Sequence, residues 1–409
     1  MQLFKILFAF SILGFPVAHA SVWETTNQWS AAWEDRYSTW VNQEWSTDYF
    51  AKPGTPYFNL SRDCADVVYT MRMIYSSLNG LPFVMKDATG GKRPISNEMK
   101  RWDQLPQEKR LRAFAVLIMQ VGSTVSLPND TLPVSIDRAK IRPGALLVTD
   151  HKSHHSLSLK DLSVTGVPTW IYSSRPAKVT ILKKIGFLSE GFTFPNGITT
   201  QSHAGLMNFR EPDDLYKQPW EIPGFSEEQY HPPFVRGHWI ENVKAKLALK
   251  KETPSEELTR VMASTCDSAG ERIANVQDAM DFLATQAPQA CLDASRYDDF
   301  STPSRDQRLL DSFQELKSAY TNSQRSHASL NKILAEQVES VLIQDDLHRT
   351  PGVETFCPVQ ISKSQTLSLG EIRRRSFQNL LSSNPNDPFE YRWGEKSGHS
   401  EKAKRCPTF

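Results

Sequence analysis

Residues 61–66 read SRDCAD, and Cys64 is the side chain of this stretch that can do covalent chemistry. Asp63 suits the N-cap of a helix, and Asp66 three residues later completes a capping pattern. A cysteine in the first helical turn meets the positive end of the helix dipole, which favours the thiolate, and backbone N–H groups that can hold an oxyanion. Such a cysteine can transfer acyl groups. The two aspartates disfavour the thiolate, so a histidine partner would have to offset their charge.

The residues after Cys64 predict one amphipathic helix over residues 64–78. Asn79-Gly80 then provides a stop signal. Cys64 lies on the apolar stripe of this helix and therefore points inward, where a cysteine is either a packing residue or a functional thiol. The apolar positions that recur with helical spacing from Cys64 are Val67, Val68, Met71, Ile74, Tyr75 and Leu78.

The first twenty residues, MQLFKILFAFSILGFPVAHA, predict a secretory signal peptide. Lys5 is their charged residue, an apolar run follows, and residues 18–20 have the small-x-small form of a cleavage site. The apolar run is too short to span a bilayer and contains Pro16, and no later segment is a candidate span. We therefore expect residues 21–409 to be secreted or periplasmic, without an integral membrane segment.

The cysteines indicate a disulfide-bonded C-terminal half. The chain has five of them, and a secreted protein normally pairs its thiols. Four lie late in the sequence and Cys64 stands apart. Three pairings of the four are open. We favour Cys266–Cys291 and Cys357–Cys406, because these close the shorter loops. Cys64 would then be an inert buried thiol or a nucleophile.

A base for Cys64 can come from TDHKSHHSLSLKDL, residues 149–162. Alternate residues of a strand share one face. The first face is apolar with a histidine at one end, whereas the second is polar and expected to be solvated. We therefore predict that His155 points inward and is the base. The first face would carry His155, Leu157, Leu159 and Asp161, and the second His154, Ser156, Ser158 and Lys160.

A third residue is needed to orient the far nitrogen of the His155 ring. If the hairpin turn lies near residues 165–166, Ser174 on the next strand comes close to His155, and Ser173 replaces it after a one-residue slip. Asp161 is on the same face but about 20 Å further along the strand. We therefore rank Asp161 below Ser174.

The same histidines allow a metal alternative. His151, His154 and His155 with Asp150 could bind zinc. No HExxH pattern and no distant carboxylate partner accompany them, so the spacing is weak evidence for a metal. We expect no metal and no cofactor.

Composition and charge are those of a globular protein. Hydrophobic residues make up 39% of the chain and charged residues 23%, with a formal net charge of +1. No charge excess points to nucleic acid or an anionic membrane as partner.

Changes in composition predict four parts. Residues 1–20 are the signal peptide, 21–50 a Trp-rich helical segment, 51–250 a catalytic domain with long irregular loops, and 251–409 a mainly helical, disulfide-stapled domain. The helical domain could regulate access, bind a protein partner or brace the rest. In the Trp-rich segment, the aromatic residues at helical spacing indicate a docked helix, with a sugar-stacking platform as the alternative. They are Trp29, Trp33, Tyr37 and Trp40.

Residues 54–71, GTPYFNLSRDCADVVYTM, resemble the N-terminal motif of the NlpC/P60 family of papain-like cysteine peptidases, which runs from Gly-x-Pro-Tyr to Asp-Cys-Ser-Gly and an apolar helix. IRPGALLVTD resembles the strand before the family's histidine, and HSLSLKDLSVTG with TWIYSS resembles its histidine strand, turn and third-residue strand. The likeness covers residues 52–176. It departs from the family at Asn59-Leu60, where the family has Gly-Gly, and at Ala65-Asp66, where it has Ser-Gly.

The resemblance implies an α+β fold with a papain-like core, in which the cysteine-bearing helix packs on a small antiparallel sheet. It implies Cys64 as nucleophile, His155 as base, a polar third member, for which we choose Ser174, and Tyr57 near the thiol to position the substrate carbonyl. Typical members cut amide bonds in cell-wall peptides, so we expect that substrate. The alternatives are a non-catalytic wall-binding or structural module on a degenerate hydrolase fold, and an acyltransferase or lipid-directed hydrolase of the same fold.

Overall fold

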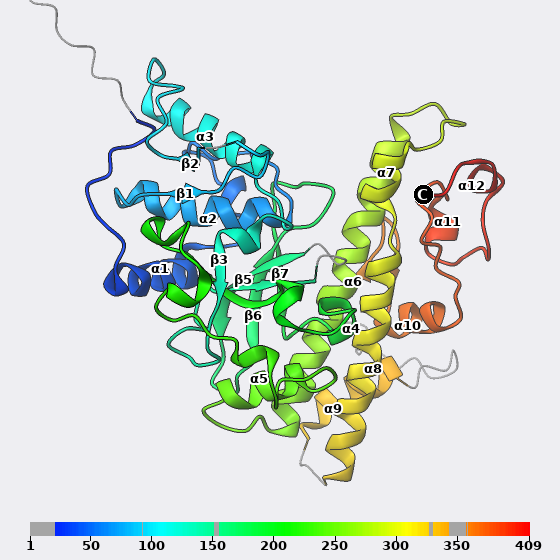
Figure 1. Cartoon of the computed structure of the whole chain (residues 1–409). Coiled ribbons are helices and arrows are strands. Elements are labelled where there is room, and N and C mark those ends of the chain that lie inside the picture. The colour runs from blue at the N-terminus through cyan, green and yellow to red at the C-terminus, as the bar shows by residue number, and fades with distance from the viewer. Residues whose placement is uncertain (1–20, 92, 151–154, 327–329, 343–356, 358) are drawn as a thin grey trace, which may run out of the picture.

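The structure is a computed structural model that describes residues 21–91, 93–150, 155–326, 330–342, 357 and 359–409. The predicted signal peptide lies outside these ranges. Within them the chain is α+β, with a six-stranded antiparallel sheet followed by a mainly helical C-terminal region (Figure 1). In spatial order the strands of the sheet are β3 (Thr131–Pro133), β8 (Gly205–Phe209), β4 (Leu146–Val148), β5 (Ser156–Leu162), β6 (Pro168–Tyr172) and β7 (Leu182–Ile185).

Local signals place the elements around Cys64 as predicted. Helix α2 spans Cys64–Leu78 and begins with a capping box between Asp63 and Asp66. Asn79 is its C-cap, and Gly80 follows with φ +58°, a backbone conformation that glycine adopts at little cost. Strands β4, β5 and β6 form an antiparallel meander, as their sequences indicate.

Both faces of the sheet are buried. The face that we call the α2 face packs against α1 (Ala31–Glu44), α2 and α3 (Gln107–Val121), and the face that we call the α5 face packs against α5 (Trp239–Leu247) and the loops around α4 (Glu190–Thr193). A small hairpin of β1 (Val84–Met85) and β2 (Ile95–Ser96) precedes α3. Sheet residues on the α2 face include Leu146, Val148, Ile171 and Met207, and those on the α5 face include Leu147, Leu157, Trp170 and Leu206.

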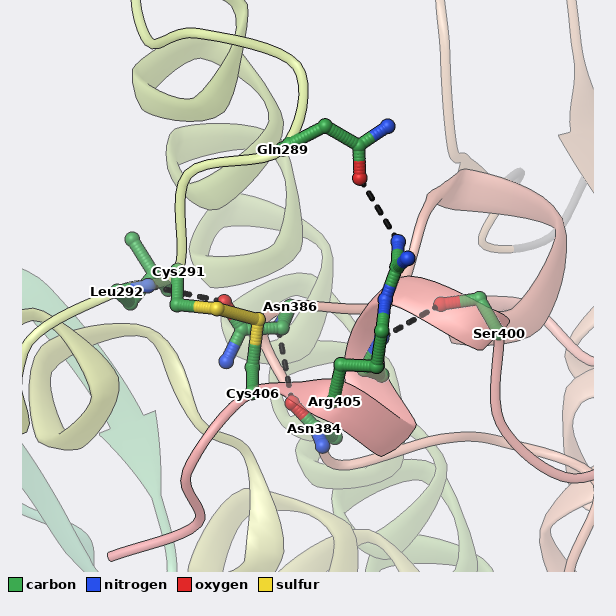
Figure 2. Close-up of a disulfide and its surroundings, with 9 residues drawn as sticks. Gln289, Cys291, Leu292, Asn384, Asn386, Ser400, Arg405 and Cys406 are labelled. Carbon is green, nitrogen blue, oxygen red and sulfur yellow. Dashed lines mark hydrogen bonds between the residues drawn. A yellow bond between two sulfur atoms is a disulfide. The ribbon is translucent and has the colours of Figure 1, made fainter.

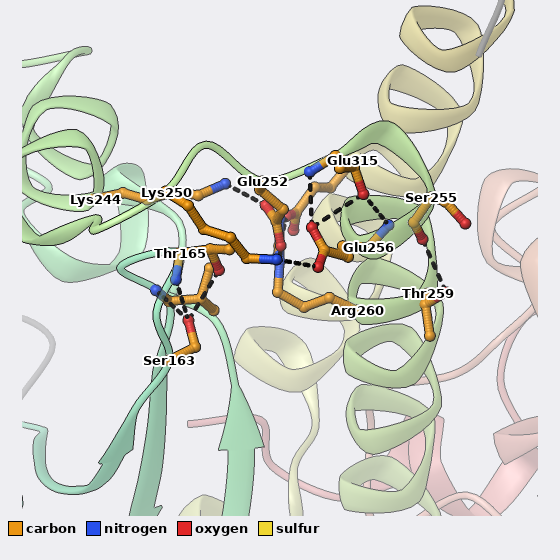
Figure 3. Close-up of polar contacts among 12 residues, drawn as sticks. Ser163, Thr165, Lys244, Lys250, Glu252, Ser255, Glu256, Thr259, Arg260 and Glu315 are labelled. Carbon is orange, nitrogen blue, oxygen red and sulfur yellow. Dashed lines mark hydrogen bonds and ion pairs between the residues drawn. The ribbon is translucent and has the colours of Figure 1, made fainter. Parts of the chain in front are cut away.

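The C-terminal region is built on two long helices, α6 (Pro254–Ala284) and α8 (Pro303–Arg325), which run side by side next to the sheet (Figure 1). Ion pairs fix the start of α6 (Figure 3): Glu252 accepts a hydrogen bond from Arg260 at 2.9 Å and pairs with Lys244 of α5, and Arg260 also contacts Glu315 of α8 at 3.3 Å. The other elements of the region are α7 (Ala294–Phe300), α9 (Lys332–Leu342), β9 (Val359–Gln360), β10 (Thr366–Leu367), α10 (Leu369–Phe377), α11 (Phe389–Arg392) and α12 (Glu401–Arg405).

The two disulfides differ from the pairing that we favoured. Cys266 pairs with Cys357, and Cys291 pairs with Cys406 (Figure 2). The shorter-loop rule fails because Cys266 lies within α6 whereas Cys291 follows the end of that helix. About 27 Å of helix between residue 266 and its end, at 1.5 Å per residue, keeps these two cysteines apart.

The Trp-rich segment forms a docked helix, as its spacing predicts. Trp29 and Tyr37 are buried, and the Trp29 indole donates to the carbonyl of Pro82 at 2.8 Å. The Trp29 ring also lies 6.0 Å from the ring of Tyr75 on α2, and the Arg72 guanidinium sits over its face at 3.4 Å. The indole and ring faces are therefore used in packing, so the sugar-stacking alternative is not supported.

Of the helices in the described part of the chain, none has the length and apolar character needed to cross a bilayer. The two disulfides indicate an oxidising, extracytoplasmic compartment.

Candidate active site

Cys64 is the first residue of α2, so its thiol lies at the mouth of the helix, as the sequence predicts. The backbone N–H of Asp63 donates to Asp66 Oδ2 at 3.0 Å, and the N–H of Asp66 reaches Asp63 Oδ1 at 3.5 Å. These reciprocal contacts satisfy two of the backbone groups at this end. The other four cysteines are in the two disulfides, so Cys64 carries a thiol.

The surroundings of the thiol keep it protonated at neutral pH. The Cys64 side chain is half-buried, and its Sγ lies 3.0 Å from the hydroxyl of Thr124, in the loop after α3. Burial raises the pKa of Cys64 to about 11, and the charges of Asp63 and Asp66 act in the same direction, whereas the Thr124 hydrogen bond lowers it. In this arrangement the residue rests as a neutral thiol and needs a base to become a nucleophile.

Burial changes the ionisation of two charged residues beside the start of α2, Asp66 and Arg62. Asp66 is 7% exposed, and burial together with Asp63 raises its pKa to about 7. Arg62 is wholly buried, with its guanidinium over the Phe50 ring and a 2.8 Å hydrogen bond to the carbonyl of Val179. Burial lowers the pKa of Arg62 to about 9. Asp66 is therefore partly protonated near neutrality and opposes a thiolate less than an ionised carboxylate would.

His155 lies on the α5 face, not on the face that carries Cys64. Its ring makes edge contacts with Tyr172 at 5.7 Å and Phe192 at 5.9 Å, both on the α5 side. The next residues confirm the alternation, because Leu157 packs into the α5-side core whereas the Ser158 hydroxyl faces Met71 of α2 at 3.7 Å. The structure therefore does not bring the His155 ring to Cys64.

The His155 ring is also held in its neutral form. Burial lowers its pKa to about 3, and the cations Arg308 and Arg305 add to this, while Glu271 acts against it. Its Nδ1 has no hydrogen-bond partner among the described residues. Where His155 sits, it packs the junction between the sheet and the C-terminal helices.

The face of β5 that we expected to be solvated is in fact buried. Ser156 and Ser158 are fully buried under α2. The alternation of polar and apolar residues along β5 therefore does not mark one face exposed to solvent and one face in the core. A base for Cys64 has to act from the α2 face. His154, which has the same parity as Ser156 and Ser158 in the sequence, lies outside the described residues, as does His151.

Ser174, the residue that we predict to orient the His155 ring, makes a hydrogen bond to the C-terminal region. The Ser174 hydroxyl accepts a hydrogen bond from Arg305 of α8 at 3.0 Å. A bulge between Leu159 and Asp161 shifts the register of β5 with β6, so that Ser158 pairs with Ile171. Continued by three residues, this register puts Ser174 opposite His155, as the sequence predicts. Ser173, the alternative, is buried and donates to the carbonyl of Arg62 at 2.7 Å, which places it next to the start of α2.

Tyr57 and Asp161 lie away from the thiol. The Tyr57 hydroxyl is 3.2 Å from that of Ser77, which is thirteen residues after Cys64 and so about 20 Å further along α2. The Asp161 carboxylate accepts from Asn42 of α1 at 3.2 Å. Neither residue is placed to touch a substrate carbonyl at Cys64.

Sequence reasoning missed Thr124 and Arg62 as neighbours of the helix mouth, and it named Ser173 only as an alternative partner for the His155 ring. The Ser173 hydroxyl donates to the backbone carbonyl of Arg62, and the backbone of Arg62 also exchanges two hydrogen bonds with that of Lys178. Thr124 comes from a loop sixty residues away in sequence, and no local pattern marks it. Among the described residues, no group of three His, Cys, Asp or Glu side chains could hold a metal, and two of the three histidines in the zinc alternative lie outside that part of the chain.

No family model, curated protein or solved structure matches this chain. The resemblance to the NlpC/P60 family rests on the motifs within residues 52–176 and stays a prediction.

Proposed function

We propose that this chain is a secreted or periplasmic thiol hydrolase in which Cys64 attacks an amide carbonyl, in a peptide of the cell wall. The observation that carries the proposal is the position of Cys64. Its thiol sits in the first turn of a helix that packs on one face of an antiparallel sheet, while the other cysteines are in disulfides. The substrate class comes from the motif around Cys64 and from the oxidising compartment.

In the proposed reaction a histidine removes the proton from the Cys64 thiol as sulfur attacks the carbonyl carbon. Backbone N–H groups of the first turn, that of Cys64 and a neighbour, stabilise the oxyanion. The C–N bond then breaks, and the amine leaves with the proton from the histidine. Water, deprotonated by the same histidine, hydrolyses the thioester and restores the thiol. General-base activation suits a cysteine that rests as a neutral thiol.

The base is drawn from the histidines of residues 151–155. His155 was our choice, but its buried, neutral ring on the α5 face is a poor acceptor for a proton from the α2 face. His154 precedes His155 in the sequence and lies outside the described residues, so it is the second histidine that the experiment tests.

Single substitutions at these positions test the proposal. Purified cell-wall peptides are incubated with the oxidised protein, and newly released amino groups are quantified, with a lipid ester as a parallel substrate. We expect Cys64→Ala and His154→Ala to abolish peptide cleavage, and His155→Gln to retain it unless the fold is lost. Release of amino groups by Cys64→Ala at the wild-type rate would refute the thiol mechanism. Cleavage of the lipid ester alone would replace the amide substrate.

One observation favours a second function, a non-catalytic module on a hydrolase-like fold. The pKa of Cys64 is raised to about 11, and acidic residues flank it. An inert thiol would have these properties. No cleavage of either substrate by the wild-type protein, with its disulfides intact, would favour this function.

A further inference from the structure

The C-terminal region contains a buried carboxylate paired with a histidine. Asp387 is wholly buried, and its Oδ2 lies 2.6 Å from Nδ1 of His399 and accepts the hydroxyl of Ser382 at 2.6 Å. Its Oδ1 accepts the backbone N–H of Ser400 at 2.7 Å. Burial raises the pKa of Asp387, but the hydrogen bonds from His399, Ser382 and Ser400 outweigh it and lower the pKa overall. Asp387 is therefore an ionised acceptor.

The ionised Asp387 fixes which nitrogen of His399 carries hydrogen. A carboxylate can only accept, so Nδ1 of His399 must donate to it. In the neutral ring, Nε2 then carries the lone pair. The His399 side chain is 52% exposed, and the hydrogen bonds among the described residues engage Nδ1 rather than Nε2. Nε2 is an oriented acceptor at the surface, the arrangement in which proteins present imidazole to a ligand.

A cavity of about 450 Å³ lies beside this ring, within the usual size of small-ligand sites. Its polar side chains are amides and hydroxyls, among them Asn379, Ser383, Asn384 and Thr408. Among the side chains that line it, none carries a carboxylate, an amine or a guanidinium. A charged ligand would find no counter-charge among these side chains, so their amides and hydroxyls suit a neutral ligand with many hydroxyl groups.

Two aromatic rings form an apolar wall of the same cavity. Tyr297 and Phe409 meet edge to face with ring centroids 5.6 Å apart, and Phe409 is 66% exposed. The disulfide between Cys291 and Cys406 holds the C-terminal segment that leads to Phe409, and Arg405 reinforces it through a 2.8 Å hydrogen bond to Gln289 (Figure 2). An exposed ring held in place can pack on the C–H face of a pyranose.

We propose that this cavity is a binding site for a neutral saccharide unit, in which His399 Nε2 accepts a hydrogen bond from a sugar hydroxyl and the Phe409 ring packs on the sugar face. The site lies in the helical region and shares no residue with the Cys64 site. It therefore stands or falls independently of the proposed hydrolase.

The test uses the full mature chain with N,N′-diacetylchitobiose and maltose as probes, with binding followed by saturation-transfer NMR and calorimetry. His399→Asn keeps a donor for Asp387, because its amide nitrogen replaces Nδ1, but removes Nε2. We expect it to weaken binding about threefold to tenfold, the effect of one lost hydrogen bond, without a change in the unfolding midpoint. Phe409→Ala should weaken binding as well. His231→Asn, a substitution at an exposed histidine elsewhere, is the matched control and should bind as wild type does.

Three results would each contradict the proposal, and the third concerns the neutral ligand. The first is no binding of either probe at up to about 10 mM, where a site with a dissociation constant of about 1 mM would be nearly saturated. The second is binding that His399→Asn and Phe409→Ala both leave unchanged. If His399→Asn fails to fold, Phe409→Ala decides alone, since its exposed ring contributes little to the core. Tighter binding of glucuronic acid than of both probes would contradict the neutral ligand.

Discussion

Glu271 of α6 joins the sheet to the C-terminal helices through a buried ion pair. It is 9% exposed, and its Oε2 accepts from Arg308 of α8 at 3.0 Å, while its Oε1 accepts the hydroxyl of Tyr172 on β6. Lys184 of β7 is buried nearby and acts on the same carboxylate. We predict that Glu271→Gln strongly destabilises the protein, because it leaves the Arg308 guanidinium, with a side chain 10% exposed, without its charge partner.

The size of the effect follows from the geometry. Two unit charges 3.0 Å apart attract by about 5 kcal/mol at an effective dielectric constant of about 20. The desolvation of the pair offsets much of this attraction in the wild-type protein. Removal of one partner leaves the other as an uncompensated buried charge, which typically costs about 3–5 kcal/mol of folding stability. We therefore expect Glu271→Gln to lower the free energy of unfolding by about 3–5 kcal/mol at pH 7.

The effect should depend on pH. Burial raises the pKa of Glu271, but Arg308, Lys184 and the Tyr172 hydroxyl outweigh it, so the pKa in the folded state lies below its ordinary value. A depressed pKa contributes stability that is present above the unfolded-state pKa and is lost as the pH falls through the folded-state pKa. The difference between wild type and Glu271→Gln should therefore shrink in acid.

Urea unfolding followed by circular dichroism measures this difference. Glu315→Gln is the matched control, because its side chain is 49% exposed and its 3.3 Å contact with Arg260 lies in solvent. We expect the control to cost less than about 1 kcal/mol. If Glu271→Gln costs no more than Glu315→Gln at pH 7, the buried pair does not hold the two regions together and the reasoning fails.

Two further predictions concern the cysteines. The raised pKa of Cys64 predicts slow modification by iodoacetamide at pH 7, with a rate that rises about tenfold per pH unit towards pH 11. The Thr124→Val variant should react more slowly still, because it loses the hydrogen bond that lowers the pKa of the thiol. A rate that is already constant below about pH 8 would instead reveal a stabilised thiolate. Replacing both Cys291 and Cys406 by Ser should lower the free energy of unfolding by about 2–5 kcal/mol, because the disulfide closes a long loop of the unfolded chain, and an unchanged urea midpoint would contradict this.

The elements around Cys64 follow from local sequence. Asp63 and Asp66 form the capping box that their spacing predicts, and α2 runs from Cys64 to Leu78 before the Asn79-Gly80 stop. Caps and helical stripes act within a few residues, so the sequence contains all the information that they need. The thiol at the helix mouth is predictable for the same reason.

The orientation of β5 is not predictable from its own residues. Alternation reveals the inner face only when the other face meets water. Here helices α1–α3 cover one face and α5 with its loops covers the other, so Ser156 and Leu157 are both fully buried. An apolar neighbour therefore does not show that His155 faces the Cys64 helix. Which helix covers which face is a tertiary property, and no alternation within residues 155–162 encodes it.

On the α5 face, the His155 ring lies close to charged side chains of the C-terminal helices. His155 lies between the Tyr172 and Phe192 rings, close to the Glu271–Arg308 pair. A protonated imidazole there would face Arg308 and Arg305, so the ring stays neutral and acts as a flat, partly polar packing group. Residues that sequence analysis assigns to one active site thus belong to two different places. Cys64 belongs to the mouth of α2, whereas His155 and Ser174 belong to the contact between the sheet and α8. The C-terminal region therefore contacts the end of β6 and the residues just after it, through Arg305 on the Ser174 hydroxyl and through Glu271, which binds both the Tyr172 hydroxyl and Arg308.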